Sequence, residues 1–369
     1  MDFGGINPVI LIATLMASAV PILLAALGEA VVERSGVLNL GVEGMMIMGA
    51  LGGFVVAVET GSPLLGFVGG AVAGAVLSLC FALLTQVFLA NQVATGLALT
   101  LFGLGLSSLG GQGYNGIKPP ATGQLLPDFM ADLPVVGPIV FGHDWVVYFS
   151  IAMTAVLWWV LKSTRIGLII RAVGESHEAA HALGYKVNRI RLGCIAFGGA
   201  MAGMGGAYIS LARVPQWVDG ITTGAGWIAL AIVVFASWKP WRVLIGAYLF
   251  GGITVLQLNV QVNGGLPSGI LFLISLVCIV ALLVLYLLRA GRTPQQSLNP
   301  LLVIALAFPP IVWAVAVLLG LRVIKLPVEY LSMAPYLITI LVLVIMSAGR
   351  NSKANGAPAC LGQNFHASR

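Results

Sequence analysis

Long unbroken apolar runs are the feature that most limits what this chain can fold into. The run from Ile270 to Leu288 contains no charged residue, and only 8% of the whole chain is charged while 59% is hydrophobic. A soluble domain is about a quarter charged, so these runs exclude a water-soluble fold. A membrane-crossing helix needs about 20 apolar residues, whereas a membrane β-barrel would show alternating segments of roughly 10 residues. The chain is therefore predicted to be a helical membrane protein.

Eleven apolar segments can be drawn along the sequence. They predict an all-α, polytopic membrane protein with about 11 transmembrane helices in a single domain over residues 1–369. The segments are 8–28, 41–58, 63–89, 92–110, 143–161, 192–212, 224–238, 242–258, 268–288, 300–320 and 331–348.

Small residues recur within these segments at helical spacing. Gly66, Gly70 and Gly74 repeat every four residues, and Gly199 and Gly203 do the same. Such small faces let helices approach closely in lipid. We therefore expect tight helix packing at these glycines.

The basic residues are distributed unevenly over the loops. When the loop 162–191 is placed in the cytoplasm and the segments alternate from it, 14 of the 18 basic residues fall inside. The inside group is Arg34, Lys162, Arg165, Arg171, Lys186, Arg189, Arg191, Lys239, Arg242, Arg289, Arg292, Arg350, Lys353 and Arg369. Cytoplasmic loops carry excess Lys and Arg, so the asymmetry predicts an outside N-terminus and a cytoplasmic C-terminus. The net charge of +6 has the same origin and does not indicate nucleic-acid binding.

The cationic loop 162–191 separates two apolar segments and contains a short helix-favouring stretch. Residues Glu178 to Leu183 favour a helix. Gly184 suits the position just after a helix end, where a left-handed backbone is common. An exposed polar loop of this kind on a membrane protein is a place where another protein can dock.

Polar side chains gather at two segment starts. Asn39 and Glu43 are four residues apart, so on one helix they would share a face. Asn91, Gln92 and Thr95 open the fourth segment. A polar or ionisable side chain inside a membrane needs a partner or a water-filled cavity. These five residues therefore either line a path for a hydroxylated solute or serve as helix starts and contacts between helices.

Common catalytic and metal-binding motifs are absent from the sequence. There is no Gly-Lys-Ser/Thr phosphate-binding loop and no His-Glu-x-x-His motif. The cysteines Cys80, Cys194, Cys278 and Cys360 are scattered, without the spacing of metal ligands or of a disulfide framework. We expect no catalytic residues, no metal site and no cofactor in this chain.

Three stretches resemble one protein family. They are Ser35 to Gly44 (SGVLNLGVEG), 167–184 (GLIIRAVGES, then EAA and ALG) and Ala196 to Ala207 (AFGGAMAGMGGA). These stretches are similar to permeases of ABC importers for ribose, nucleosides and branched-chain amino acids. The resemblance extends over roughly 30–258 and again over 325–369.

The resemblance implies a transmembrane subunit of an ATP-driven importer, with ATP hydrolysed by a separate ATP-binding subunit. In the family a short cytoplasmic coupling helix lies in a groove of that ATPase. The implied coupling residues are Arg171, Glu175, Glu178, Ala179, Ala180 and Gly184. A second, homologous permease subunit, an external substrate-binding protein, a small-molecule substrate and a place in the plasma (inner) membrane are also implied. Nucleosides or related pentose-containing solutes are the expected cargo, with simple sugars as the second choice.

The resemblance is interrupted by two additional apolar segments at about 266–324. We interpret them as an insertion of two helices into nine that follow the family pattern. Two other classes of function stay open. A secondary transporter driven by ions or protons is disfavoured because no acid pair lies in the middle of a segment. A membrane scaffold without transport is disfavoured by the polar segment starts.

Overall fold

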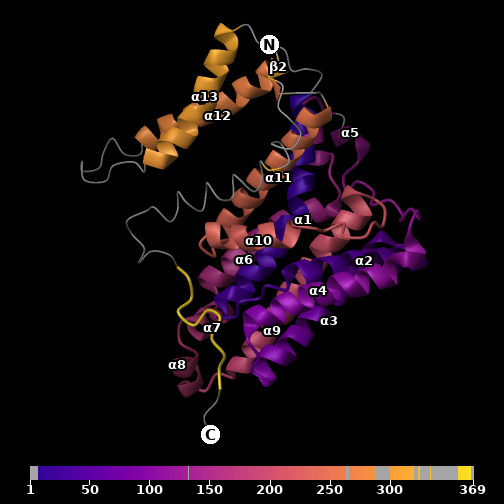
Figure 1. Cartoon of the computed structure of the whole chain (residues 1–369), viewed down its shortest axis with the longest axis vertical. Helices are drawn as coiled ribbons and strands as arrows, with labels where there is room; N and C mark the ends of the chain where they lie inside the picture. Colours follow the sequence, from indigo (N-terminus) through magenta and orange to yellow (C-terminus); the bar gives the residue numbers. More distant parts are fainter. Residues whose placement is uncertain are drawn as a thin grey trace. The chain divides into compact units, whose positions relative to one another are not determined.

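A computed structural model of the chain describes residues 7–131, 133–262, 266–287, 300–319, 323–324, 333 and 356–366. The described residues group into two compact units. The larger lies within Leu15–Gly251 and Asn355–Arg369, and the smaller within Met1–Thr14 and Gly252–Ala354. Both are built almost entirely from α-helices, which confirms the predicted fold class (Figure 1).

Among the described residues, seven helices are long and apolar enough to cross a membrane, and there are three shorter apolar helical stretches. The long helices are α1 (Pro8–Arg34), α2 (Val42–Thr60), α3 (Pro63–Ala82), α4 (Gln92–Gly111), α6 (Trp145–Ser163), α9 (Val187–Tyr208) and α11 (Pro240–Val262). Turns of π-helix extend α3 through Leu83–Val87 and α9 through Ile209–Arg213. Between them lie α5 (Asp128–Ala131), α7 (Arg165–Glu175), α8 (His177–Ala182) and α10 (Ala225–Phe235).

The smaller unit contains the two segments that we interpreted as an insertion. They form α12 (Ser268–Leu287) and α13 (Pro300–Leu318), which lie side by side. The rings of Phe272 and Trp313 meet between them with centroids 5.1 Å apart. Next to them, β1 (Leu266–Pro267) pairs antiparallel with β2 (Val323–Ile324). The predicted segment 331–348 lies outside the described residues, apart from Met333.

The segment 224–238 forms a shorter helix than predicted, and this helix is too short to cross a membrane alone. α10 has 11 residues, about 16 Å at 1.5 Å per residue. Its start follows Gly224, which has φ +89°, and its end is followed by Ser237 and Trp238, both in the left-handed region. Backbone of this kind cannot continue a right-handed helix, and it stops α10 at both ends.

The first helix is longer than the predicted segment 8–28. α1 continues to Arg34 because its two acids, Glu29 and Glu33, are buried and hydrogen-bonded rather than exposed at a helix end. A buried carboxylate with partners can remain inside a helix bundle. The end of the apolar run at residue 28 is therefore not the end of α1.

Glycines bring α2, α3 and α9 into close packing, as their four-residue repeats predicted. A Cβ atom at Gly74 would lie 2.2 Å from the carbonyl oxygen of Gly199. A Cβ atom at Gly203 would lie 2.2 Å from the carbonyl oxygen of Gly70. The helices therefore meet backbone to backbone, the arrangement that small residues permit in membranes.

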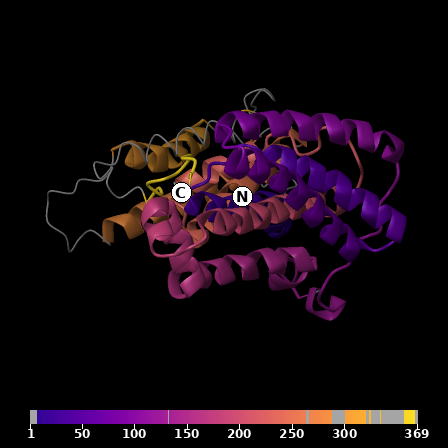
Figure 2. The same ribbon diagram turned by 90° about the horizontal axis from the view of Figure 1, so that it is seen from below.

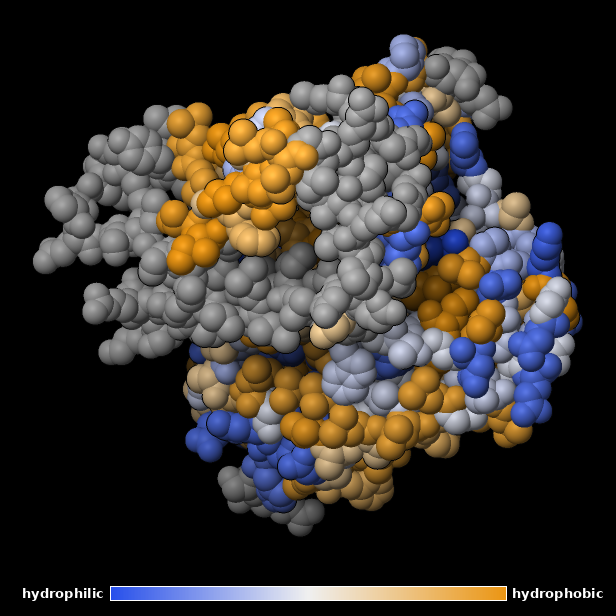
Figure 3. Space-filling model, turned by 45° about the horizontal axis from the view of Figure 1, so that its top comes forward, coloured by the Kyte–Doolittle hydropathy of each residue, from blue (hydrophilic) through white to orange (hydrophobic). Residues whose placement is uncertain are grey.

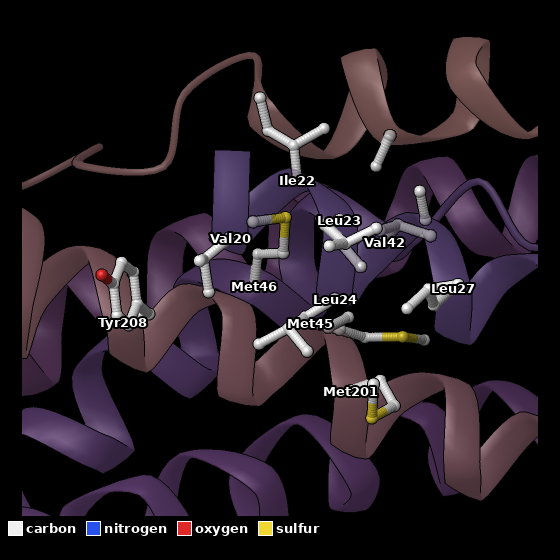
Figure 4. Packing of buried hydrophobic residues seen from close by; sticks show 14 of the residues in the cluster. Val20, Ile22, Leu23, Leu24, Leu27, Val42, Met45, Met46, Met201 and Tyr208 are labelled. Carbon is white, nitrogen blue, oxygen red and sulfur yellow. The ribbon is translucent and has the colours of Figure 1, made fainter. Parts of the chain in front are cut away.

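Next to this close packing of α2, α3 and α9, the helices α1, α2 and α9 share a core of leucine and methionine side chains (Figure 4). Leu23 and Leu24 of α1 and Met45 and Met46 of α2 have no exposed surface. Met201 of α9 lies among them in Figure 4. Methionine is flexible and fills irregular gaps, which suits a core where helices approach at unequal distances.

The outer faces of α3 and α4 are apolar and exposed. Val68, Val72 and Val76 recur every four residues on α3, each more than half exposed, and Leu101 of α4 is 72% exposed. Figure 3 shows hydrophobic side chains over broad areas of the described surface, with hydrophilic residues gathered in separate groups. Such faces are expected where a helix contacts lipid rather than water.

Candidate functional site

The segment between α1 and α2 carries the first group of predicted site residues. Asn39 is fully buried, and its side-chain Oδ1 accepts a hydrogen bond from the Gly41 backbone N–H at 2.9 Å. Asn favours such turns because its short side chain can bond the backbone two residues on. α2 begins only at Val42. Asn39 therefore precedes the helix, and the expected helical face shared by Asn39 and Glu43 is wrong.

Glu43 lies in the first turn of α2 and reaches the start of α10. Its carboxylate accepts hydrogen bonds from the Thr222 hydroxyl at 2.9 Å and from the Gly226 backbone N–H at 2.8 Å. Gly226 permits this approach, since a Cβ atom there would lie 2.6 Å from the Glu43 Cα. The first N–H groups of a helix lack partners within it and favour a negative charge. Glu43 thus caps α10 and holds α2 against it.

Two buried acids of α1 join this region, and the sequence analysis did not select them. Glu29 and Glu33 lie one turn apart near the end of α1, each 1% exposed. Glu29 Oε1 accepts a hydrogen bond from the Asn39 backbone N–H at 3.3 Å, and Glu33 Oε2 accepts one from the Trp238 indole N–H. Their four-residue spacing was the available signal.

The start of α4 carries the second group. Asn91 is exposed and caps α4, accepting a hydrogen bond from the Ala94 backbone N–H at 3.0 Å. Gln92 is buried, and its Oε1 accepts a hydrogen bond from the Leu38 backbone N–H at 2.8 Å. Thr95 is 8% exposed, and its hydroxyl makes no hydrogen bond with any described residue.

These two groups meet at one junction between residues 38–41 and the start of α4. Gly96 is packed so closely that a Cβ atom there would lie 2.8 Å from the Leu40 backbone nitrogen. Asn39, Glu43 and Gln92 already hydrogen-bond protein groups there. Of the buried polar residues at this junction, Thr95 is therefore the one whose side chain has no hydrogen-bond partner among the described residues. Within the described ranges, no group of three or more His, Cys, Asp or Glu side chains could hold a metal ion.

The C-terminal segment, residues 356–366, ties this junction to α7. Gln92 Nε2 donates a hydrogen bond to Asn364 Oδ1 at 3.0 Å, and Asn364 Nδ2 donates to the Leu89 carbonyl oxygen at 2.7 Å. The Cys360 backbone N–H donates to the Gly174 carbonyl oxygen at 2.9 Å. Figures 1 and 2 both show this yellow segment beside the helices that follow α6. Nothing in the sequence indicated these contacts.

Arg191 binds the C-terminal segment to the turn after α1. It is fully buried near the start of α9, although the sequence analysis counted it only as a cytoplasmic basic residue. Its Nε–H donates to the Ser35 carbonyl oxygen at 3.2 Å, and its Nη1–H donates to the Gln363 carbonyl oxygen at 3.0 Å. A buried charge needs such partners, and here Nε and Nη1 have them, while Nη2 is buried without a hydrogen-bond partner among the described residues. The guanidinium therefore fixes three separate parts of the chain together.

Two short helices occupy the loop 162–191, and they carry the predicted coupling residues. Arg171 and Glu175 lie in α7, and Glu178, Ala179 and Ala180 lie in α8. Glu175, Glu178 and Ala179 are exposed, while Ala180 is buried. The exposed members are therefore accessible to another subunit, and Ala180 faces the protein.

Helix α7 was not expected, since the sequence analysis assigned a helix only to Glu178 through Leu183. Its buried face carries Ile170 and Val173, whereas Ile166 and Leu168 are exposed. The Thr164 hydroxyl caps its start by accepting a hydrogen bond from the Gly167 N–H at 3.2 Å. Apolar residues recurring every three or four positions were the signal for this helix.

Gly184 ends α8 as predicted. Its φ is +87°, in the left-handed region that glycine adopts without strain. Its N–H donates to the His181 carbonyl oxygen at 2.8 Å, and the Tyr185 N–H donates to the Ala180 carbonyl oxygen at 3.1 Å. This pair of bonds is the Schellman motif, so the prediction of a glycine C-cap is confirmed.

Phe365 of the C-terminal segment packs on α8. Its ring centroid lies 5.2 Å from that of His177 and 5.3 Å from that of His181. Burial and the nearby charge of Arg191 lower the pKa of His177, against a smaller opposing effect of Glu178. A neutral ring at physiological pH packs on the phenyl ring without a charge to desolvate. The C-terminal segment therefore contacts both the polar junction and the predicted coupling helix.

Comparison with known proteins identifies a family for this sequence. Residues 11–282 match the family of the permease component of branched-chain amino acid transport systems. A provisionally named glucose ABC transporter permease of Haloferax volcanii is 45% identical over 254 residues, which cover 68% of this chain and 77% of that protein.

Two further relatives carry nucleoside names. A guanosine ABC transporter permease of Bacillus subtilis is 33% identical over 68% of this chain and 82% of its own length. A nucleoside ABC transporter permease of Lactococcus lactis is 30% identical over 79% of this chain and 96% of its own length. A second permease of Haloferax volcanii, also named for glucose, is 28% identical to this chain. A second permease of Bacillus subtilis, also named for guanosine, is 22% identical.

Proposed function

This chain belongs to the family of permease components of branched-chain amino acid transport systems, and from that premise we propose that it carries nucleosides across the membrane. As a family member it is a multi-pass transmembrane subunit of an ABC importer and not an enzyme. ATP hydrolysis is the task of a separate subunit, and an external binding protein delivers the solute. Nucleosides as the transported solute are supported by the relatives that are named for guanosine and for nucleosides.

A simple sugar is the second candidate cargo, because the 45% identical relative is named for glucose. Nucleosides and sugars share a hydroxylated ring, so both suit a path with neutral hydrogen-bonding groups. We expect uptake of tritiated guanosine, above that of tritiated glucose, by cells that express the complete transporter. Cells in which the ATPase subunit cannot hydrolyse ATP serve as the control. Uptake of glucose alone would assign the sugar, and ATP-independent uptake of either solute would contradict an importer of this class.

We propose that the partner permease is a homologous but different chain. The named relatives occur in pairs for one solute in one organism. We expect this chain to co-purify with a second permease. We also expect that the tagged chain does not capture an untagged copy of itself. Capture of its own copy would indicate a homodimer.

We propose a plasma-membrane location with the N-terminus outside and the C-terminus in the cytoplasm. The uneven distribution of basic residues supports this orientation. A single cysteine at Ser176, in a chain whose native cysteines are replaced, should react with a membrane-impermeant maleimide only after permeabilisation. A cysteine at Lys118 is expected to react in intact cells. The reverse pattern at the two positions would overturn the orientation.

We propose that Thr95 contacts the solute, while Asn39, Glu43 and Gln92 hold the junction around it and Asn91 caps α4. Thr95→Val keeps the shape of the side chain and removes only the hydroxyl. A neutral hydrogen bond contributes about 0.5–1.5 kcal/mol, so the KM for uptake should rise roughly 2- to 12-fold, with the amount of folded protein unchanged.

Thr100→Val is the matched control for Thr95→Val. The Thr100 hydroxyl is already used, since it donates to the Leu40 carbonyl oxygen at 3.2 Å. This variant should lower thermal stability without a specific change in KM. Unchanged uptake by Thr95→Val would contradict a contact between Thr95 and the solute. The polar residues of the junction would then serve only as helix caps and as contacts between helices.

A further inference from the structure

A cationic pocket lies where three helices of the larger unit begin or end. It has a volume of about 300 Å³, and its lining includes Arg34, Lys162, Arg171 and Lys239, with Trp158 and Trp241 beside them. Arg34 is the last residue of α1, Lys162 lies in the last turn of α6, and Lys239 immediately precedes α11. No Asp or Glu side chain lines this pocket.

The positive charges of the pocket are not neutralised within the described part of the chain. None of the four basic side chains forms an ion pair there. Arg34 reaches only the carbonyl oxygens of Ser237 and Trp238, at 3.5 Å each. Glu175 is close enough to interact electrostatically with Arg34 but does not line the pocket. Four basic side chains around one hollow, without an ion pair among the described residues, create a positive potential that attracts an anion from outside the chain.

The aromatic residues place the pocket at the level of the membrane surface. Lys162 Nζ lies 4.7 Å from the centre of the Trp158 ring. The ring of Trp241, 46% exposed, carries the Arg242 guanidinium at 5.4 Å. Tryptophan with lysine or arginine at the end of an apolar helix is typical of the boundary between hydrocarbon and headgroups.

Helix α7 has the pattern of a helix that lies in this boundary. It has 11 residues, too few to cross a membrane, and its Ile166 and Leu168 are 65% and 60% exposed. Arg165 and Arg171 flank these apolar side chains. A short amphipathic helix with exposed apolar residues and flanking cations inserts its apolar face among lipids.

An apolar cavity adjoins the cationic pocket. It has a volume of about 470 Å³, lies among α6, α7 and α9, and shares Leu161 with the cationic pocket. Ile166, Ile169 and Phe197 contribute to its apolar lining. A charged hollow next to an apolar one matches a molecule with an anionic head and a hydrocarbon tail.

We propose that this pocket binds the phosphate headgroup of an anionic phospholipid, with an acyl chain along the apolar cavity. Basic pockets between helices on the cytoplasmic side of membrane proteins suit such headgroups. The lipid would join Arg34 of α1 to Arg171 of α7, and so brace the coupling segment against the helix bundle. Arg171, which the sequence analysis assigned to ATPase contact, would then act on the lipid.

The test uses the assembled transporter purified in detergent and titrated with dioleoyl-phosphatidylglycerol or dioleoyl-phosphatidylcholine, with bound lipid counted by native mass spectrometry. We expect tighter binding of phosphatidylglycerol. Each basic residue near an anionic lipid strengthens binding about fivefold, so Lys162→Gln with Lys239→Gln should weaken it about 25-fold. Lys162→Arg with Lys239→Arg keeps both charges and should restore binding.

Lys118→Gln with Lys186→Gln is the matched control, because it removes two exposed lysines that line neither hollow. Its phosphatidylglycerol binding should equal that of the unaltered transporter. Equal binding of the two lipids, or equal loss in the pocket and control variants, would overturn the proposal. So would pocket variants that bind phosphatidylglycerol normally but lose the ATPase subunit, because the pocket would then be a contact for an acidic surface of that subunit.

Discussion

Gly203→Ala is expected to destabilise the folded permease by roughly 3 kcal/mol or more and to abolish most of its transport. The added Cβ would lie 2.2 Å from the Gly70 carbonyl oxygen and 2.9 Å from the Gly74 Cα. Both neighbours are backbone atoms, so no side chain can rotate away to make room. Gly→Ala gains only about 1 kcal/mol of helix propensity, which is less than the expected cost of forcing α3 and α9 apart.

Gly193→Ala is the control on the same helix. A Cβ atom at Gly193 has no atom within 4 Å, so this variant gains the same propensity without the overlap. Melting in detergent, followed by size-exclusion chromatography of the unheated and heated protein, measures the difference. Equal melting temperatures for Gly203→Ala and Gly193→Ala would mean that the close contact of α3 and α9 does not limit stability.

Gly184→Val is expected to weaken binding of the ATPase subunit about 5- to 30-fold and to lower uptake in proportion. A side chain in the left-handed region costs about 1–2 kcal/mol, which corresponds to this factor. The strain can be relieved only by breaking the bonds that end α8, those from Gly184 to His181 and from Tyr185 to Ala180. The exposed face of α8, with Glu178 and Ala179, would then lose its fixed geometry. Pull-down of the ATPase subunit by the purified permease measures the effect.

Gly61→Val imposes the same strain away from the coupling segment. Gly61 ends α2 with φ +66°, and like Gly184 it has no atom within 4 Å of an added Cβ. Both variants should lose similar stability, but only Gly184→Val should lose the ATPase. Glu178→Lys, which inverts an exposed charge on α8, should also weaken binding without lowering stability. Normal ATPase binding by Gly184→Val and by Glu178→Lys would remove α8 from the coupling proposal.

Sequence patterns predicted those parts of the fold that depend on residues close together in the sequence. The four-residue glycine repeats indicated the close packing at Gly74 and Gly203, because helix geometry alone places such residues on one face. Gly184 was identified as a C-cap because glycine readily adopts the left-handed backbone. The apolar runs located the long helices, since each must be about as long as the membrane is thick.

Features that depend on distant contacts could not be predicted from the sequence. The apolar segment drawn at 8–28 ended before Glu29 and Glu33, yet α1 continues past both acids, which hydrogen-bond with Asn39 and Trp238. Arg191 looked like any cytoplasmic basic residue, although it is fully buried. Its partners come from parts of the chain that no local pattern connects to it.

The arrangement of the candidate site residues in space could not be predicted from the sequence. The five polar residues were found at two segment starts, and the structure brings four of them to one junction. Their hydrogen-bond partners, such as Asn364 for Gln92, decide which of these side chains already has a partner within the protein. Those partners lie far away in the sequence, so composition and spacing alone could not separate Thr95 from the rest.

The bond between Gln92 and Asn364 also sets an order of events during synthesis. The two residues are 272 positions apart, so at 5–20 residues per second the ribosome reaches Asn364 roughly 15 to 50 s after Gln92. Once Arg191 and α8 have been made, they still lack the Gln363 carbonyl oxygen and the Phe365 ring until the end of that interval. The region around α7 and α8 is therefore the last part of the larger unit to be completed, after the membrane helices of that unit have left the ribosome.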